Sequence, residues 1–332
     1  MKKILACILL VVMVLGLVAC GGDNAENDSA AYNVGVCQLT EHPALDAATE
    51  GFVAALEEKL GQENVNVQIS LAQGESNNCT TIINNFVSSE VDLIMANATA
   101  ALQAAVSGTN TIPILGTSIT EYGTALGIED FDGTIGGNVS GTSDLAPLDG
   151  QAQMIQEIFP EAKKVALLYC SSEPNSQYQI DVITEELTAL GYECTPYSFS
   201  DSNDIAPVLT AAIEDTDLVY VPTDNTAANN TGIIDNICRP AKIPVIAGEE
   251  GICSGCGTVT LSIDYYDIGY QTGVMAAQIL AEGADISTMP IAYAPEVTKK
   301  YNAEICEELG ISVPNDYIAI EKEKKKNLKE TS

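Results

Sequence analysis

The sequence predicts an α/β protein made of two doubly wound lobes joined by a strand hinge. Short apolar runs alternate with longer amphipathic stretches, which is typical of parallel sheets covered by helices. This alternation pauses at the Gly/Ser/Thr-rich segment Gly133–Pro147 and then starts again. The 332 residues are also enough for about two domains.

The first half of the chain predicts four strands separated by three helices. Each strand is a short apolar run, and each helix carries apolar residues at helical spacing. The expected strands are Tyr32–Leu39, Val65–Leu71, Val91–Ala96 and Thr111–Leu115, and the expected helices are Pro43–Leu60, Ser76–Ser89 and Thr99–Val106. Residues 133–147 are expected to form the last strand of this lobe and the first crossover.

The second half repeats the same order. The expected helices are Gln151–Phe159, Ser176–Leu190, Ile205–Ile213, Asn225–Cys238 and Tyr266–Ala281, and the expected strands are Lys164–Tyr169, Tyr192–Tyr197, Asp217–Val221, Ile243–Ala247 and Thr258–Ile263. Short stretches also recur, because VDLIMANATAA in the first half resembles TDLVYVPTDNTAA in the second. We therefore expect a first lobe of residues 32–145 plus about 264–290. A second lobe comprises 146–263 plus about 291–320, and a basic tail covers 321–332.

The first twenty residues are typical of an export signal. Lys2 and Lys3 precede an apolar run that ends in Leu17-Val18-Ala19-Cys20, which looks like a bacterial lipoprotein cleavage box. Residues 1–20 would then be the signal and lipobox, Cys20 the acylated residue, and residues 21–31 a flexible tether. The alternative is an uncleaved membrane anchor. We expect an extracytoplasmic protein held on the outer face of the cell membrane by a lipid on Cys20.

The charge balance excludes several classes of partner. Fourteen Lys and Arg residues stand against 46 Asp and Glu residues, a formal net charge of −32. Nucleic acids and anionic lipid surfaces require clustered cations, so neither is expected as a partner. Arg239 is the single arginine and His42 the single histidine, which leaves little for metal or general-base chemistry. No metal and no cofactor are expected.

Eight cysteines remain after Cys7 and Cys20 are set aside. An even number in an exported protein is compatible with disulfides, but several lie inside apolar runs, where free thiols are common. Cys253 and Cys256 form one C-x-x-C without a second pair or nearby histidines. We therefore expect mostly unpaired thiols, with a local disulfide as the main alternative and a metal site as the least supported one.

Polar residues cluster where the predicted strands end. In open α/β sheets, ligands bind beyond the carboxyl ends of the strands. Any single one of these residues is better explained as a helix cap. Their number at the tips of both lobes nevertheless predicts a ligand cleft formed by Glu41, His42, Asn97, Thr99, Thr117, Ser118, Ser172, Glu173, Ser176, Thr223, Asp224, Glu249, Asp264 and Tyr265.

Four segments carry a resemblance to a known family. EHPALDAATEGF (41–52), YCSSEPNS (169–176), VYVPTDNTAA (219–228) and SIDYYDIGYQTGVMAAQIL (262–280) resemble ABC-transporter substrate-binding proteins, in particular the branch of tryptophan-, tyrosine- and phenylalanine-type binding lipoproteins. The resemblance runs from about residue 32 to 320. It implies a type I periplasmic-binding-protein clamshell that captures a small molecule, often an aromatic amino acid, and delivers it to a membrane permease. The Cys253–Cys256 loop and the lysine-rich end depart from the family pattern.

The residue types constrain how an amino-acid ligand is held. Arg239 lies at a predicted helix end before Pro240, away from the strand tips. We therefore expect helix N-termini and the hydroxyls of Thr99, Ser118, Ser172 and Ser176 to bind the carboxylate. Acids must bind the ammonium group; Asp224 and Asp264 are favoured over the alternatives Glu41, Glu173 and Glu249.

Other functions are less well supported by the residues. A sugar or nucleoside is the main alternative ligand, although the absence of Trp leaves few rings for stacking. A ligand-sensing ectodomain would have the same cleft. An enzyme is not expected, because the pair Glu41 and His42 has no nucleophile motif beside it. The expected partners are a small-molecule ligand and an ABC permease, and we expect a monomer.

Overall fold

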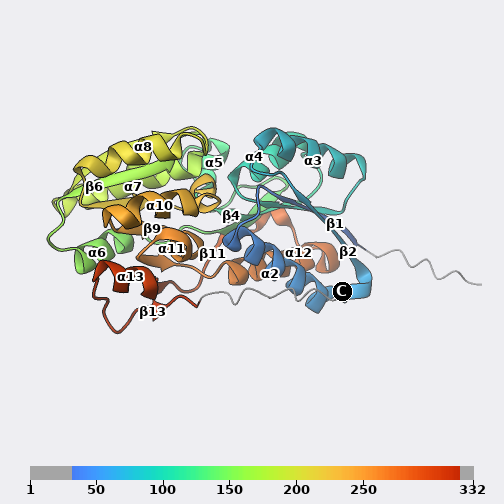
Figure 1. Cartoon of the computed structure of the whole chain (residues 1–332). Coiled ribbons are helices and arrows are strands. Elements are labelled where there is room, and N and C mark those ends of the chain that lie inside the picture. Colours follow the sequence, from blue (N-terminus) through green and yellow to red (C-terminus); the bar gives the residue numbers. More distant parts are fainter. Residues whose placement is uncertain (1–31, 322–332) are drawn as a thin grey trace, which may run out of the picture.

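The structure, a computed structural model, describes residues 32–321 and has two α/β lobes (Figure 1). The predicted signal, lipobox, tether and nearly all of the basic tail lie outside the described residues. The first lobe has a six-stranded sheet in the order β11-β5-β4-β3-β1-β2, and every neighbouring pair in it is parallel. Its strands are β1 (Tyr32–Gln38), β2 (Val65–Leu71), β3 (Leu93–Asn97), β4 (Ile114–Ile119), β5 (Val139–Ser143) and β11 (Ala292–Tyr293).

The second lobe has a seven-stranded sheet in the order β13-β12-β10-β9-β8-β6-β7. Only the pair β10 and β12 is antiparallel. Its strands are β6 (Lys164–Cys170), β7 (Glu193–Phe199), β8 (Leu218–Val221), β9 (Val245–Ala247), β10 (Val259–Ser262), β12 (Thr298–Tyr301) and β13 (Ile318–Ala319). The carboxyl ends of the parallel strands in both sheets point toward the junction of the lobes.

Helices cover both faces of each sheet. In the first lobe they are α2 (Pro43–Leu60), α3 (Ser76–Ser88), α4 (Thr99–Gly108), α5 (Tyr122–Leu126) and α12 (Tyr265–Glu282). In the second lobe they are α6 (Leu148–Ile158), α7 (Pro174–Ala189), α8 (Ile205–Ala212), α9 (Asn225–Ala228), α10 (Thr231–Ala241), α11 (Glu250–Cys256) and α13 (Ala303–Leu309). Short 3₁₀ turns lie at Gln62–Asn64, Ile213–Asp215 and Ile286–Thr288.

The alternation of side chains in buried strands builds two cores per lobe. In β6, Val165 and Leu167 face the core under α6 and α7, whereas Ala166 and Leu168 face the core under α8, α10 and α11. Strand β1 divides its side chains between two helix layers in the same way. Since both faces are buried, the central strands are almost continuously apolar, which is why the sequence showed them as short apolar runs.

The chain crosses between the lobes three times, at residues 144–147, 263–264 and 294–297. Helix α12 follows a strand of the second lobe but packs against α2 of the first. The last boundary, expected near residue 290, needs a correction. Strand β11 at Ala292–Tyr293 pairs with β5 in the first sheet, so the first lobe continues to residue 293.

Several elements differ from the sequence-based expectation. Strand β4 begins at Ile114 and continues to Ile119, so that Thr117 and Ser118 belong to the strand instead of following it. The helix expected at Asn225–Cys238 is divided into α9 and α10. The Cys253–Cys256 segment, expected to be a loop, lies in α11. Helix α5, helix α13 and the short strands β11, β12 and β13 were not predicted, because they are too short to show a period.

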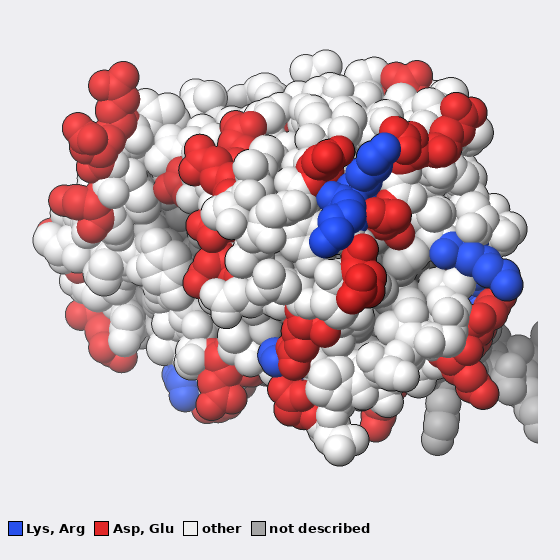
Figure 2. All heavy atoms as spheres, turned by 90° about the vertical axis from the view of Figure 1, so that its left-hand side faces the viewer, with Lys and Arg blue, Asp and Glu red and all other residues white. Residues whose placement is uncertain are grey.

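Charge is spread thinly over the surface. In the space-filling view of the second-lobe end, acidic side chains are scattered over the face and each basic group lies next to acidic ones (Figure 2). Arg239, which lies within α10, contacts Asp235, Glu304 and Glu308. The single arginine is therefore used to join α10 to α13 on the surface.

The eight described cysteines are all unpaired, and seven of them are buried. No cluster of histidine, cysteine or acidic residues suited to a metal occurs within residues 32–321. Over the same residues, no helix is long and apolar enough to cross a membrane. The thiols act as small core side chains, as Cys37 does in β1.

Helices α2 and α12 pack at backbone contact, which requires glycine. A Cβ atom on Gly269 would overlap the carbonyl of Ala48, and one on Gly51 would overlap the carbonyl of Tyr266. This contact holds α12, which follows the second crossover, against α2 of the first lobe. The hinge therefore depends on these glycines.

We expect Gly269→Ala to destabilise the protein by about 1–3 kcal/mol, because the added methyl must separate two backbones. Gly232→Ala in α10 is the matched control, since a Cβ there meets no atom within 4 Å. Urea unfolding monitored by circular dichroism measures both. Equal midpoints for the two variants would contradict the proposed packing constraint.

Candidate functional site

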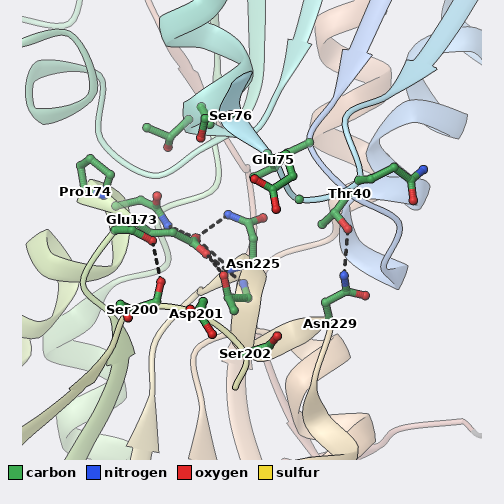
Figure 3. Close-up of a pocket in the computed structure, with 18 of the residues that line it drawn as sticks. Thr40, Glu75, Ser76, Glu173, Pro174, Ser200, Asp201, Ser202, Asn225 and Asn229 are labelled. Carbon is green, nitrogen blue, oxygen red and sulfur yellow. Dashed lines mark hydrogen bonds between the residues drawn. The ribbon is translucent and has the colours of Figure 1, made fainter. Parts of the chain in front are cut away.

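A cleft of about 390 Å³ lies between the two lobes (Figure 3). Loops after β1, β2 and β3 form one wall, and loops after β6, β7 and β8 form the other. The lining comprises Leu39, Thr40, Gln73, Gly74, Glu75, Ser76, Asn77, Thr99, Ala100, Gln103, Ser172, Glu173, Pro174, Asn175, Ser200, Asp201, Ser202, Asn225, Thr226, Asn229 and Asn230. The cleft thus lies at the strand ends, where the sequence predicted it.

Two hydrogen bonds join the lobes beside this cleft. Asn229 Nδ2 donates to Thr40 Oγ1 at 2.9 Å, and His42 Nε2 lies 3.2 Å from Asn225 Oδ1 (Figure 3 shows the first of these). Thr40 and His42 belong to the first lobe, and the two asparagines belong to the second. The structure therefore represents a closed arrangement of the lobes.

Glu173 organises the second-lobe wall. One carboxylate oxygen accepts from the N–H and the Nδ2 of Asn225 at 3.0 and 2.8 Å. The other accepts from the N–H and the hydroxyl of Thr226 at 2.9 and 2.7 Å. These four bonds hold the start of α9, and they orient the asparagine that reaches His42 (Figure 3).

His42 is buried at the closed junction, and its Nε2–H donates to Asn225 Oδ1. Its Nδ1 has no hydrogen-bond partner among the described residues. Burial lowers the pKa of His42, while the Asn225 hydrogen bond acts in the opposite direction. The ring is therefore neutral at pH 7 and serves the lobe contact without positive charge.

Of the fourteen residues predicted for the site, three line this cleft: Thr99, Ser172 and Glu173. The loops after β2 and β7 were missed, although each directly follows a predicted strand. Residues 73–77 and 200–202 carry Gln, Glu, Asn, Asp and Ser side chains of the same kind as the predicted tips. Applying the strand-end rule to the outer strands as well would have found them.

The two residues favoured as ammonium ligands, Asp224 and Asp264, have other contacts in this structure. Asp224 Oδ1 accepts from the Ala227 N–H at 2.8 Å and Oδ2 accepts from the Cys170 N–H at 2.7 Å, so both oxygens are used inside the second lobe. Burial and the charge of Glu173 raise the pKa of Asp224 to about 8. Asp264 is exposed and caps α12 through the Asp267 N–H. Neither carboxylate lines the cleft.

Other predicted residues have structural roles. Asn97 Nδ2 donates to the Leu45 carbonyl and to Thr49, and Thr117 contacts Thr142, all inside the first lobe. Ser176 is buried beside Asn175. The backbone N–H of Thr223 donates to Gln179. Glu41 is exposed and lies outside the cleft lining.

Ser118 has the features of a binding residue instead. It is the second-to-last residue of β4 and has a φ of +55°, a conformation that costs free energy for a non-glycine residue. Its buried hydroxyl has no hydrogen-bond partner among the described residues. A strained residue with an unpaired hydroxyl at a strand tip is typical of a ligand contact.

A second polar group lies where the crossovers meet. Tyr265 donates its hydroxyl hydrogen to Asp144 Oδ2 at 2.9 Å, while Asp144 Oδ1 has no partner among the described residues. Burial raises the pKa of Asp144 to about 6. Asp144 is not among the predicted site residues, because it lies in the expected crossover segment and not after a recognised strand.

Glu249 lies close to this group from the second lobe. Its carboxylate accepts from the N–H groups of Gly251 and Ile252 and so caps α11. Burial raises the pKa of Glu249 to about 7, and the charges of Glu250 and Asp144 act in the same direction. The junction therefore contains two buried carboxyls from opposite lobes.

The chemistry available in the cleft is that of binding. The lining residues offer amides, hydroxyls and the carboxylates of Glu75, Glu173 and Asp201, and none of them is a lysine or arginine. Nothing in this set forms a nucleophile with an adjacent base. Two lobes that close over a polar cleft define a solute-binding protein.

Comparison with known proteins places the chain in a family. Residues 33–325 match the model of the ABC transporter substrate binding proteins, and the chain belongs to this family. Proteins of this family bind substrates and are not enzymes. Among curated proteins, a tyrosine-binding protein of Clostridioides difficile (strain R20291) is 33% identical over 94% of this chain and 92% of its own length.

Solved structures agree with this assignment. An ABC domain from Streptococcus pneumoniae in complex with L-Trp has a TM-score of 0.82 and 28% identity, covering 86% of this chain and 97% of that one. A ligand-free, open substrate binding protein from Clostridium difficile has a TM-score of 0.68 and 34% identity, covering 87% and 99%. The better overlap with the L-Trp complex, despite its lower identity, agrees with the closed lobes.

The buried carboxyls make stability depend on pH. A carboxyl whose pKa is higher in the folded than in the unfolded state favours folding while it is protonated, and this contribution is lost as pH rises through the shifted pKa. For Glu249 the shift is from 4.5 to about 7. We expect the melting temperature of the ligand-free protein to fall between pH 5 and pH 8.

In Glu249→Gln, the free energy of unfolding is expected to fall less between pH 5 and pH 8 than in the wild type, by up to about 3 kcal/mol. Glu185→Gln, which changes an exposed residue of α7, is the matched control and should retain the wild-type slope. The control also accounts for the loss of one negative charge. Differential scanning calorimetry at several pH values measures the slopes; a slope unchanged in Glu249→Gln would contradict the assignment.

Proposed function

We propose that this protein captures an aromatic amino acid in its interlobe cleft and delivers it to an ABC importer. The observation that carries the proposal is the closed polar cleft between the lobes. Ser118 Oγ in β4 and Asp144 Oδ1 directly after β5 are buried and have no hydrogen-bond partner among the described residues. The tyrosine-binding relative and the L-Trp complex support the aromatic class. The family, that of the ABC transporter substrate binding proteins, supports the importer part of the proposal.

The affinity needed is compatible with such a ligand. Micromolar binding requires about −8 kcal/mol. Burial of an aromatic side chain of about 200 Å² contributes roughly 5 kcal/mol before the costs of association. Polar contacts to the head group must supply the remainder. A closed cleft with contacts from both lobes meets this requirement, whereas a single open lobe does not.

The carboxylate of the ligand would be held without a cationic side chain. Arg239 is bound to three acids on the surface of α10 and α13. Thr99, at the first residue of α4, lies in the cleft wall. Ser118 lies near the end of β4, which pairs with β3, the strand that leads into α4. Its hydroxyl has no hydrogen-bond partner among the described residues. Helix N-terminal N–H groups and these hydroxyls are the expected partners.

A sugar or other polyol is the second candidate ligand. The cleft lining is rich in Ser, Thr, Asn and Gln, which suit hydroxyl groups. However, no aromatic ring is among the lining residues, so the stacking surface common in sugar sites is missing there. A ligand screen separates the two candidates.

We expect L-Tyr, L-Trp or L-Phe to raise the melting temperature of the purified protein. At a ligand concentration about 100 times the Kd, the stabilisation is about 2.7 kcal/mol, or roughly 5–10 °C for a chain of this size. Thermal-shift measurements with amino acids, sugars and nucleosides side by side provide the test. Stabilisation by sugars alone would favour the second candidate and exclude the first.

We also propose that the protein is a lipoprotein on the outer face of the cell membrane. The support comes from the sequence: a basic start, an apolar run, and a small residue before Cys20. The polar segment 21–31 would then separate the lipid from the folded body, which begins at β1. The permease is the expected membrane partner, and a monomer suffices because the cleft is formed within one chain.

Cys20→Ala is expected to release the protein from membranes, because the acylated residue is removed. Cys7→Ala, within the apolar run, is the matched control and should leave the protein membrane-bound. Fractionation of cells followed by immunoblotting measures both. A Cys20→Ala variant that stays in the membrane fraction would point to an uncleaved anchor.

A further inference from the structure

Asp144 occupies the point where the two lobes are joined. It directly follows β5 in the first crossover, and its N–H donates to the Ile119 carbonyl at 3.1 Å. Tyr265, whose hydroxyl binds Asp144 Oδ2, begins α12 just after the second crossover. Burial raises the pKa of the Tyr265 hydroxyl, while the side chain of Thr223 in the second lobe also acts on this hydroxyl and lowers its pKa by a smaller amount. Asp144 therefore lies between strand tips of both lobes.

The carboxylate of Asp144 is buried without a cation. Its relative exposure is 3%, and Oδ1 has no hydrogen-bond partner among residues 32–321. Three titratable groups interact electrostatically or by a hydrogen bond with the Asp144 carboxyl. They are Tyr265 of α12, Tyr122 of α5 and Glu249 before α11. All three are neutral or acidic. Burying a carboxylate without a positive partner costs free energy, and the described residues place no cation beside Asp144.

The neighbouring acids are not equivalent to Asp144. Glu249 uses its carboxylate to cap α11, and Asp224 uses both oxygens to bind backbone N–H groups of the second lobe. Asp264 is exposed. Asp144 is the buried carboxylate at the lobe junction with an oxygen left for an external donor.

From this arrangement we infer that Asp144 binds the primary ammonium group of the ligand. Tyr265 holds Oδ2 in place, and Oδ1 accepts a hydrogen from the ammonium group. The inference rests on the proposed function, since it requires an amino-acid ligand between the lobes. Asp144 is not among the residues that line the 390 Å³ cleft, so the ammonium group must reach from that cleft to the crossovers. Because Asp144 lies at the hinge, a ligand bound there contacts the crossovers as well as the lobe walls.

If Asp144 binds the ammonium group, the affinity for the ligand must depend on pH. An ammonium group beside Asp144 favours the ionised carboxylate, whereas protonation of Asp144 removes the charge that the ammonium needs. Burial raises the pKa of Asp144 to about 6 in the ligand-free protein. Affinity for an amino acid should therefore fall as pH decreases below about 6, and affinity for an analogue without the amino group should not follow this pattern.

The test compares L-tyrosine with 3-(4-hydroxyphenyl)propionate, which lacks only the amino group, by isothermal titration calorimetry. Wild-type protein should prefer L-tyrosine. We expect Asp144→Asn to weaken L-tyrosine binding at least tenfold and to leave the analogue within about threefold of its wild-type affinity. Asp149→Asn, an exposed residue of α6, is the matched control and should bind both as the wild type does. The melting temperature of each variant reports folding.

The outcomes separate the two proposals. If the wild type binds no aromatic amino acid, the proposed function fails, and this inference fails with it. If the wild type binds L-tyrosine and Asp144→Asn binds it equally well, the proposed function stands and the inference is overturned. Equal loss of both ligands in Asp144→Asn would also overturn it, because Asp144 would then support the hinge and not the ammonium group. Selective loss of L-tyrosine supports it.

Discussion

The hydrogen bonds from His42 to Asn225 and from Asn229 to Thr40 hold the two lobes together over the cleft. The site depends on them, because each lobe by itself presents only one wall of strand tips. Glu173 holds the residues that make the contact on the second lobe. Since these bonds are few and polar, the lobes can separate at modest cost and admit a ligand.

Cationic side chains are scarce in this chain, and this scarcity limits which groups can recognise a ligand in the cleft. The only arginine is engaged by acids on α10 and α13, and none of the cleft-lining residues is basic. A carboxylate on the proposed ligand would have to bind backbone N–H groups and hydroxyls, while acids are abundant. The net charge of −32 is thus compatible with binding an amino acid, provided that the positive charge comes with the ligand.

The hinge and the site share residues. Asp144 and Tyr265 connect two of the three crossovers through one hydrogen bond, and Glu249 approaches from the second lobe. The close packing of α12 on α2 through Gly51 and Gly269 fixes one side of this junction. A ligand that contacts Asp144 would therefore stabilise the closed arrangement directly, which links binding to the motion that a transporter can detect.

The sequence by itself determined the two-lobed α/β architecture and the position of the cleft. Buried parallel strands must be apolar and their ends must be polar, and both patterns are local. It did not determine which polar tips face the ligand. Asp224 has the same chemistry as Asp144, but its oxygens are used by nearby N–H groups, whereas Asp144 is left with one free. Only the tertiary structure decides this, because hydrogen-bond partners come from residues far apart in the chain.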